Sequence, residues 1–163
     1  MKRYILTGTP GCGKTSILRL LEVAGYRVVE EAATDVNAIR HAQGISEPHM
    51  QPFFIDDIVN LQKRRQVQKI DPSSTVQFFD RSPLCTYALS RWLSFPISPV
   101  LAAEIDRIAA ERIYEKQVFF IENLGFCEPT AARRISFEDS LRFEKVHEDV
   151  SRVRIRVPQC GSG

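Results

Sequence analysis

The stretch that most constrains this chain lies near its N-terminus, between a short apolar run and a segment whose apolar residues have helical spacing. It reads Gly8-Thr9-Pro10-Gly11-Cys12-Gly13-Lys14-Thr15. The order of strand, glycine-rich turn and helix, with the spacing G-x-x-x-x-G-K-T, predicts a loop whose backbone N–H groups wrap around a polyphosphate. Glycine gives the backbone the freedom that such a loop needs. The alternative, a glycine-rich turn before a surface helix, leaves the Gly-Lys-Thr at the helix start unexplained.

The residue types in the loop predict how it binds its ligand. The helix that begins near Lys14 directs unpaired N–H groups and its positive dipole end toward an anion. Lys14 can reach the outer phosphates, and the Thr15 hydroxyl can ligate Mg²⁺. ATP is the expected nucleotide, because no N-K-x-D motif indicates GTP. The expected binding residues are Thr9, Pro10, Gly11, Cys12, Gly13, Lys14, Thr15 and Ser16.

Composition excludes several classes of protein. The 163 residues are 44% hydrophobic and 26% charged, which fits one globular domain. The net charge of +2 favours neither nucleic acid nor a membrane surface as a partner. No apolar run approaches the ~18 residues of a membrane span, and the first residues are too polar for a secretory segment. The four cysteines have no C-x-x-C spacing and the three histidines are scattered, so we expect neither zinc nor disulfides and a cytoplasmic location.

The segment after the loop predicts a parallel crossover unit. A helix with a broad buried face (Ile17, Leu18, Leu20 and Leu21) ends at Gly25, and a strand follows over 26–30. Strand, helix and strand in this order predict a parallel sheet with its ligands at the carboxyl ends of the strands. Glu30 and Glu31 fall at such an end. Either is a candidate base or binder of substrate hydroxyls, or both form the acidic start of a helix over 32–42.

A second acidic position ends the strand predicted over 75–80. Asp80 at the carboxyl edge of the sheet can hold a metal-bound water next to Thr15. Arg81 can direct a planar set of donors at a phosphate or carboxylate in the same cleft. The alternative is a helix-terminal acid followed by an exposed arginine. A helix from about residue 53 to 70 precedes this strand, with Phe53, Phe54, Ile58 and Leu61 inward and the cluster Lys63-Arg64-Arg65 on a solvated face.

The later part of the chain predicts two more helices, a strand and a lid. The helices run from 83 to 93 and from 100 to about 114, after prolines that interrupt the chain, and the strand over 117–122 brings Glu122 and Asn123 to the ligand edge. Arg133 and Arg134 lie in the segment 124–136, which we expect to close over the transferring phosphoryl group. A solvated basic loop is the alternative.

Together these motifs resemble the small P-loop kinase-like ATPases, the AAA-type domains related to the ribosylnicotinamide kinase domain and, more distantly, to deoxynucleoside and thymidylate kinases. The resemblance covers residues 4 to about 150. It rests on 8–15, 25–33, 79–82 and the arginine-bearing segment before Phe143. It implies a three-layer α/β fold whose parallel sheet has five strands in the order 2-3-1-4-5. Related sequences usually carry an arginine three residues after the acid that matches Glu31, where this chain has Thr34.

The last residues depart from the resemblance. The kinase-like domain is expected to occupy 1–150, and 151–163 form an atypical basic tail. The genetic code permits codons from Val150 onward that, read one base later, give Tyr-Arg-Glu-Phe-Gly-Tyr-Glu-Cys-Leu-Ser-Val-Ala, the continuation that the resemblance implies. One hypothesis is therefore a shift of reading frame near Val150, which would replace the fifth strand. A divergent natural terminus is the other.

The sequence thus favours an ATP-dependent, Mg²⁺-requiring phosphotransferase for a small nucleoside-like or nucleotide-like acceptor. Lys14, Asp80, Arg81, Glu31, Arg133 and Arg134 are the expected catalytic residues, and Thr15 and Asp80 the metal ligands. The rival interpretation is a regulatory nucleotide-binding module with weak hydrolysis that switches a partner interaction. Acceptor-dependent ADP release would separate the two. A nucleic-acid-dependent ATPase has little support, because no basic track extends beyond 63–65.

Overall fold

A parallel β-sheet of four strands, in the order β2-β3-β1-β4, forms the centre of the computed structural model, which describes residues 1–8, 11–68 and 73–121. Its elements are β1 (Lys2–Gly8), α1 (Lys14–Val23), β2 (Arg27–Val29), α2 (Ala32–Ala42), the 3₁₀ helix η1 (Pro48–Met50), α3 (Phe53–Val67), β3 (Val76–Asp80), α4 (Pro83–Trp92), α5 (Pro99–Ala110) and β4 (Val118–Ile121). The strand order predicted for the first four strands is confirmed. The fifth strand, the segment 124–136 and the tail lie outside the described residues.

The register of the strands aligns their carboxyl ends. Leu6 of β1 is opposite Asp80 of β3, and Val29 of β2 is opposite Phe79. On the other side of β1, Gly8 is opposite Ile121 of β4. The segments that follow β1, β2 and β3 therefore all leave the sheet at one edge, which is where a parallel sheet binds its ligands.

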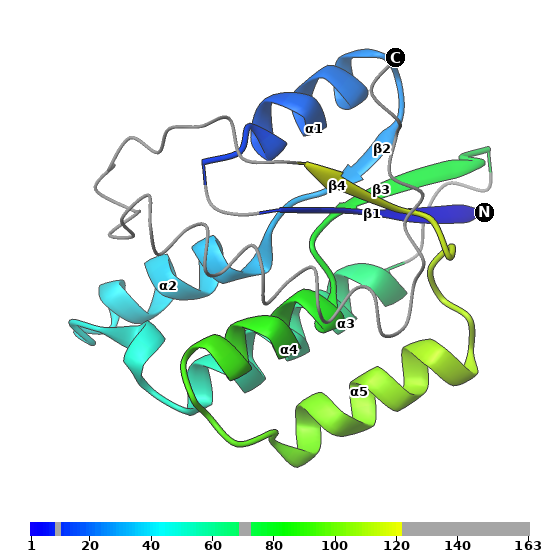
Figure 1. Ribbon diagram of the computed structural model, residues 1–163. Coiled ribbons are helices and arrows are strands. Elements are labelled where there is room, and N and C mark those ends of the chain that lie inside the picture. The colour runs from blue at the N-terminus through cyan, green and yellow to red at the C-terminus, as the bar shows by residue number, and fades with distance from the viewer. Residues whose placement is uncertain (9–10, 69–72, 122–163) are drawn as a thin grey trace.

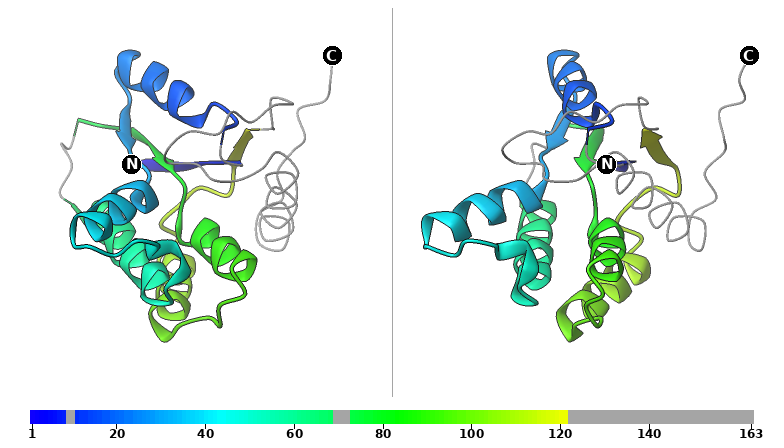
Figure 2. Two further views of the ribbon diagram at one scale, coloured as in Figure 1. Left: turned by 90° about the vertical axis from the view of Figure 1, so that its left-hand side faces the viewer. Right: turned by 60° about the vertical axis from the view of Figure 1, so that its left-hand side comes forward.

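Helices cover both faces of the sheet, which gives the three-layer α/β architecture expected from the sequence. Helix α1 contacts β1, β2 and β3 on one face, while α2 to α5 lie on the opposite side (Figures 1 and 2). The helical layer has its own apolar core, in which α3 packs against α5 through Ile55, Val59, Leu101 and Ile105. A second cluster joins α2 to α3. The helices of this layer thus hold the β2–α2 and β3–α4 turns in fixed positions.

Three local expectations were wrong. Leu20 is 69% exposed, because α1 meets the sheet through a narrower face centred on Leu18. Phe53 is 38% exposed, and its ring packs under the Arg40 guanidinium at 4.9 Å instead of entering the core. Pro99 begins α5 rather than breaking the chain before it, since its missing N–H costs nothing at the first helical position and the Ser98 hydroxyl accepts from Leu101 N at 3.1 Å.

Two helix ends also differ from the sequence prediction. Helix α5 ends at Ala110, before the expected 114, where Arg112 adopts a positive φ of 50°. Helix α3 ends at Val67, before the expected 70, and residues 69–72 lie outside the described ranges.

No helix within the described ranges combines the length and the apolar character that crossing a bilayer requires.

Candidate nucleotide-binding site

The described glycines of the loop adopt backbone conformations that other residues rarely take. Gly11 and Gly13 have φ of 89° and 88°, and Gly13 is the residue from which α1 starts. Gly8 has a φ of 139°, and a Cβ built on it would lie 2.3 Å from the Ile121 carbonyl oxygen and 2.9 Å from Cys12 Sγ. Gly8 is therefore required for the close approach of β1 to β4, and the other two for the shape of the loop. Thr9 and Pro10 lie outside the described residues.

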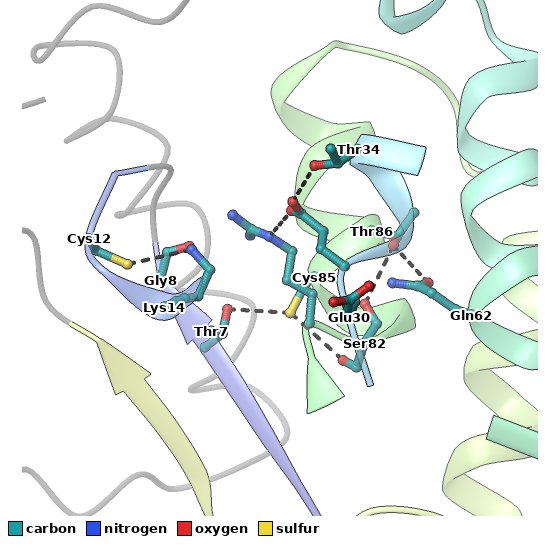
Figure 3. A network of polar contacts seen from close by, with 12 residues as sticks. Thr7, Gly8, Cys12, Lys14, Glu30, Thr34, Gln62, Ser82, Cys85 and Thr86 are labelled. Carbon is teal, nitrogen blue, oxygen red and sulfur yellow. Dashed lines mark hydrogen bonds and ion pairs between the residues drawn. The ribbon is translucent and has the colours of Figure 1, made fainter. Parts of the chain in front are cut away.

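Lys14 is buried at the first turn of α1, with 7% of its surface exposed. Its Nζ donates to the Gly8 carbonyl oxygen at 3.2 Å and to Cys12 Sγ at 3.5 Å, as Figure 3 shows. Burial lowers the pKa of Lys14, and the positive charge of Arg81 lowers it further. The ammonium group is thus held over the start of the loop, where an anionic ligand would stabilise its charged form.

The neighbours of Lys14 in the loop differ in exposure. Cys12 is 2% exposed, and its thiol contacts Lys14 rather than solvent. Thr15 and Ser16 are exposed at the first turn of α1. The buried position of Cys12 fits a small residue packed beneath the loop.

Asp80 ends β3 and is buried, with 7% of its surface exposed. It lies opposite Leu6, two residues before Gly8, so it reaches the sheet edge beside the phosphate loop. A carboxylate and the Thr15 hydroxyl are both oxygen donors, the type that Mg²⁺ prefers. The described residues contain no cluster of three or more metal-ligating side chains, and this pair fits a metal whose other ligands are phosphates and water.

Glu31 and Arg81 form an ion pair across the same edge, with Arg81 Nε donating to Glu31 Oε1 at 2.6 Å. Their side chains are 30% and 11% exposed. Glu31 precedes α2 but its side chain makes no capping hydrogen bond; it accepts instead from Arg81 and from the Thr34 hydroxyl, the latter at 2.9 Å. Burial raises the pKa of Glu31, but Arg81 and Lys14 outweigh it, so the pKa lies below its usual value. Thr34 thus supports the Glu31 carboxylate.

The backbone of Arg81 is itself unusual. Its φ of 71° is left-handed, a conformation that costs a non-glycine residue about 1–2 kcal/mol. Its N–H donates to the Leu6 carbonyl oxygen at 2.9 Å, which extends the β1–β3 pairing by one residue. The left-handed conformation of Arg81 turns the chain between β3 and α4, and its guanidinium remains at the carboxyl edge of the sheet. Observed backbone strain of this kind is common at functional positions.

A buried polar network, which sequence reasoning missed, supports this turn. The Ser82 hydroxyl accepts from Leu84 N at 3.2 Å and caps α4. Cys85 Sγ donates to Thr7 Oγ1 at 3.3 Å (Figure 3). Thr86 donates to Gln62 Oε1 of α3 at 2.9 Å. The Ser82-Pro83 pair was the available sign of a helix start. The contacts to Thr7 and Gln62 span the tertiary structure and leave no sequence pattern.

The other predicted residues have separate positions. Glu30 is exposed and pairs with Arg19 of α1 rather than with Arg81. Arg65, which the sequence placed on a solvated face, is partly buried and donates to backbone carbonyls at the β2–α2 turn. Arg133 and Arg134 lie outside the described residues, as do Glu122 and Asn123. Of the predicted catalytic residues, the structure therefore brings together Lys14, Asp80, Glu31 and Arg81.

The parallel sheet in the order 2-3-1-4, with a glycine-rich loop between its central strand and the first helix, is that of a P-loop kinase-like domain. A family model described as an AAA domain matches residues 3–158, and the chain belongs to this family. No match was found among curated proteins.

Solved structures share the fold. One, described as the NadR protein in complex with NAD and AMP-PNP, has a TM-score of 0.64 at 13% identity over 99% of this chain and 45% of that one. Another, described as the NadR protein in complex with NR, has a TM-score of 0.59 at 14% identity over 99% of this chain and 46% of that one. The chain thus spans less than half the length of either structure.

Proposed function

We propose that this domain is an ATP-dependent, Mg²⁺-requiring phosphotransferase whose acceptor is a hydroxyl of a small nucleoside-like or nucleotide-like molecule. The observation that carries the proposal is the meeting of Lys14, Asp80 and the Glu31–Arg81 pair at one sheet edge. The NadR structures, one described as a complex that includes AMP-PNP and the other as a complex with NR, agree with a site for a nucleoside triphosphate and a small molecule.

The loop side of the site binds the nucleotide. Backbone N–H groups of the loop and the Lys14 ammonium hold the phosphates, with Thr9, Pro10 and Gly11 to Ser16 as the surrounding residues. Thr15 and Asp80 would hold Mg²⁺, which supplies charge neutralisation at the outer phosphates when it is bound. Burial and Arg81 lower the pKa of Lys14. A phosphate beside the ammonium group would counteract both effects, because a negative charge favours the protonated form of lysine.

The β2–α2 side binds the acceptor. Glu31 stays ionised at neutral pH, because Arg81 and Lys14 overcome the effect of burial on its pKa. A carboxylate of low basicity accepts a hydrogen bond from the acceptor hydroxyl and orients it, rather than removing its proton beforehand. Arg81 anchors Glu31 and brings positive charge to the edge. We also propose that Arg133 and Arg134, in a lid over 124–136, neutralise the transferred charge.

The first experiment measures ADP release from Mg²⁺-ATP with and without a panel of nucleosides, nucleotides and NR. We expect at least one acceptor to stimulate release, and Lys14→Ala to abolish it while the far-UV circular dichroism spectrum is unchanged. Lys116→Ala, which changes an exposed lysine before β4, is the matched control. Wild-type turnover in Lys14→Ala would refute the assignment of the loop.

The domain limits and the tail belong to the same proposal. We propose a kinase-like domain over 1–150 and a shift of reading frame near Val150, which DNA sequencing of the coding region tests. The assay should be repeated on a variant that carries the continuation Tyr-Arg-Glu-Phe-Gly-Tyr in place of the tail. If both proteins bind nucleotide but neither is stimulated by an acceptor, the regulatory module is favoured instead.

A further inference from the structure

One member of the basic cluster 63–65 faces the candidate site. Arg65, on α3, has a side chain that is 22% exposed. Its NH1 donates to the Glu30 carbonyl oxygen at 2.9 Å and to the Glu31 carbonyl oxygen at 3.1 Å, and its NH2 pairs with Asp35. Arg64 is exposed on the same helix. Arg65 therefore contacts the β2–α2 turn as an individual side chain, and the contact is not a general effect of a basic surface.

The two carbonyl groups belong to the turn that sets the direction of the Glu31 side chain. β2 ends at Val29 and α2 begins at Ala32, so Glu30 and Glu31 are the only residues between the two elements. A planar guanidinium that donates to successive carbonyls fixes the orientation of both peptide planes. A lysine ammonium at the same place is a point charge on a flexible stem, so it would hold the two planes less firmly.

The consequence reaches the ion pair. With the turn fixed, Glu31 Oε1 lies 2.6 Å from Arg81 Nε, on a residue 50 positions further along the chain. Glu31 has φ of −60° and ψ of 131°, an extended conformation immediately before a helix. A rotation of this peptide would move the carboxylate away from Arg81 and from the Thr34 hydroxyl together.

We infer that Arg65 is a positioning residue for the acceptor: it holds the β2–α2 turn so that Glu31 meets Arg81 and presents its carboxylate at the sheet edge. The inference rests on the proposed function, in which Glu31 orients the acceptor hydroxyl. In this proposal Arg65 acts through the backbone of Glu31.

The experiment compares Arg65→Ala and Arg65→Lys with Arg64→Ala, the matched change one residue earlier on an exposed side chain. We expect both Arg65 variants to lower kcat/KM for the acceptor by about tenfold or more, as expected when a reacting group is misplaced. The KM for Mg²⁺-ATP should stay within about twofold of wild type, because the loop is unaffected. Asp35→Asn, which removes the ion pair but leaves the carbonyl contacts, should change kcat/KM little.

A second measurement does not depend on turnover. ¹³C NMR titration of the Glu31 carboxyl group should give a pKa below its usual 4.5 in wild type and a higher value in Arg65→Ala, since the contact with Arg81 loosens. If no acceptor stimulates ADP release by the wild-type protein, the proposed function is refuted but the positioning role of Arg65 is not. The titration would then test that role by itself. Unchanged kinetics and an unchanged Glu31 pKa in Arg65→Ala would overturn the positioning role, as would an equal loss for ATP and acceptor.

Discussion

Replacing Gly8 by alanine tests whether the first glycine of the loop serves the packing of the sheet. In the folded protein the new Cβ would lie 2.3 Å from the Ile121 carbonyl oxygen, a contact that no real Cβ makes. That oxygen belongs to the backbone of β4, which cannot move without disturbing its pairing with β1. The Cys12 sulfur, at 2.9 Å, belongs to a side chain that can shift. The main obstacle is therefore the neighbouring strand.

The expected magnitude has two parts. A φ of 139° is a strained conformation for alanine and costs about 1–3 kcal/mol. Forced close contact in a packed interior adds about 1–3 kcal/mol, and the rigid partner places this case at the upper end. We expect a total loss of about 4 kcal/mol of unfolding free energy, which lowers the Tm of a chain of this size by roughly 8–16 °C.

Gly44→Ala supplies the matched control. Gly44 has a φ of +86°, and a Cβ built on it would meet nothing within 4 Å, so alanine there adds strain without a collision. Its expected cost is about 1–2 kcal/mol. The assay is urea unfolding of both variants, followed by circular dichroism. Equal losses of stability in the two variants would refute the argument from close approach. The double variant Gly8→Ala/Cys12→Ala removes the contact with the Cys12 sulfur but keeps the contact with Ile121, so full recovery of stability in it would refute the argument as well.

Two further predictions concern charged side chains. The pKa of Glu31 is lowered in the folded state, so the stability that its carboxylate contributes is present above its ordinary pKa of 4.5 and is lost as the pH falls through the folded value. In urea titrations, the difference in unfolding free energy between wild type and Glu31→Gln should therefore narrow below pH 4.5. A difference that stays constant with pH would contradict this prediction. Glu104, 3% exposed, accepts from Arg107 at 2.7 and 2.8 Å, so Glu104→Ala should cost about 3 kcal/mol. Glu111→Ala, which removes an exposed partner of the same arginine, should cost at most about 0.5 kcal/mol by chemical denaturation; similar losses would count against the buried pair.

Local patterns predicted most of the architecture. The loop sequence, the strand before it and the helix after it gave β1, α1 and the first crossover, because glycine freedom and helical spacing act within a few residues. The helix over 32–42 was predicted with its observed bounds. Exposure of single side chains was less predictable: Leu20 lies outside the face that α1 turns to the sheet, and Phe53 packs against Arg40 at the surface.

In the candidate site, too, local sequence patterns predicted some features and the tertiary structure decided others. Sequence alone identified Lys14, Asp80 and Arg81 as candidates, since residues at strand ends and loop starts follow from the order of elements. It named Glu31 as a catalytic residue while keeping Glu30 as an alternative, and it treated Arg65 as part of a solvated cluster. The structure separates them: Glu31 pairs with Arg81, Glu30 with Arg19.

What the sequence determined by itself is the class of the fold and the phosphate loop, because both depend on residue types and spacings along a short stretch. The tertiary structure decided which acid meets which arginine and that Arg65 holds the turn beneath Glu31. Those contacts join residues 34 to 50 positions apart. Their geometry depends on how α2 and α3 pack beside the sheet, and no local pattern carries that information.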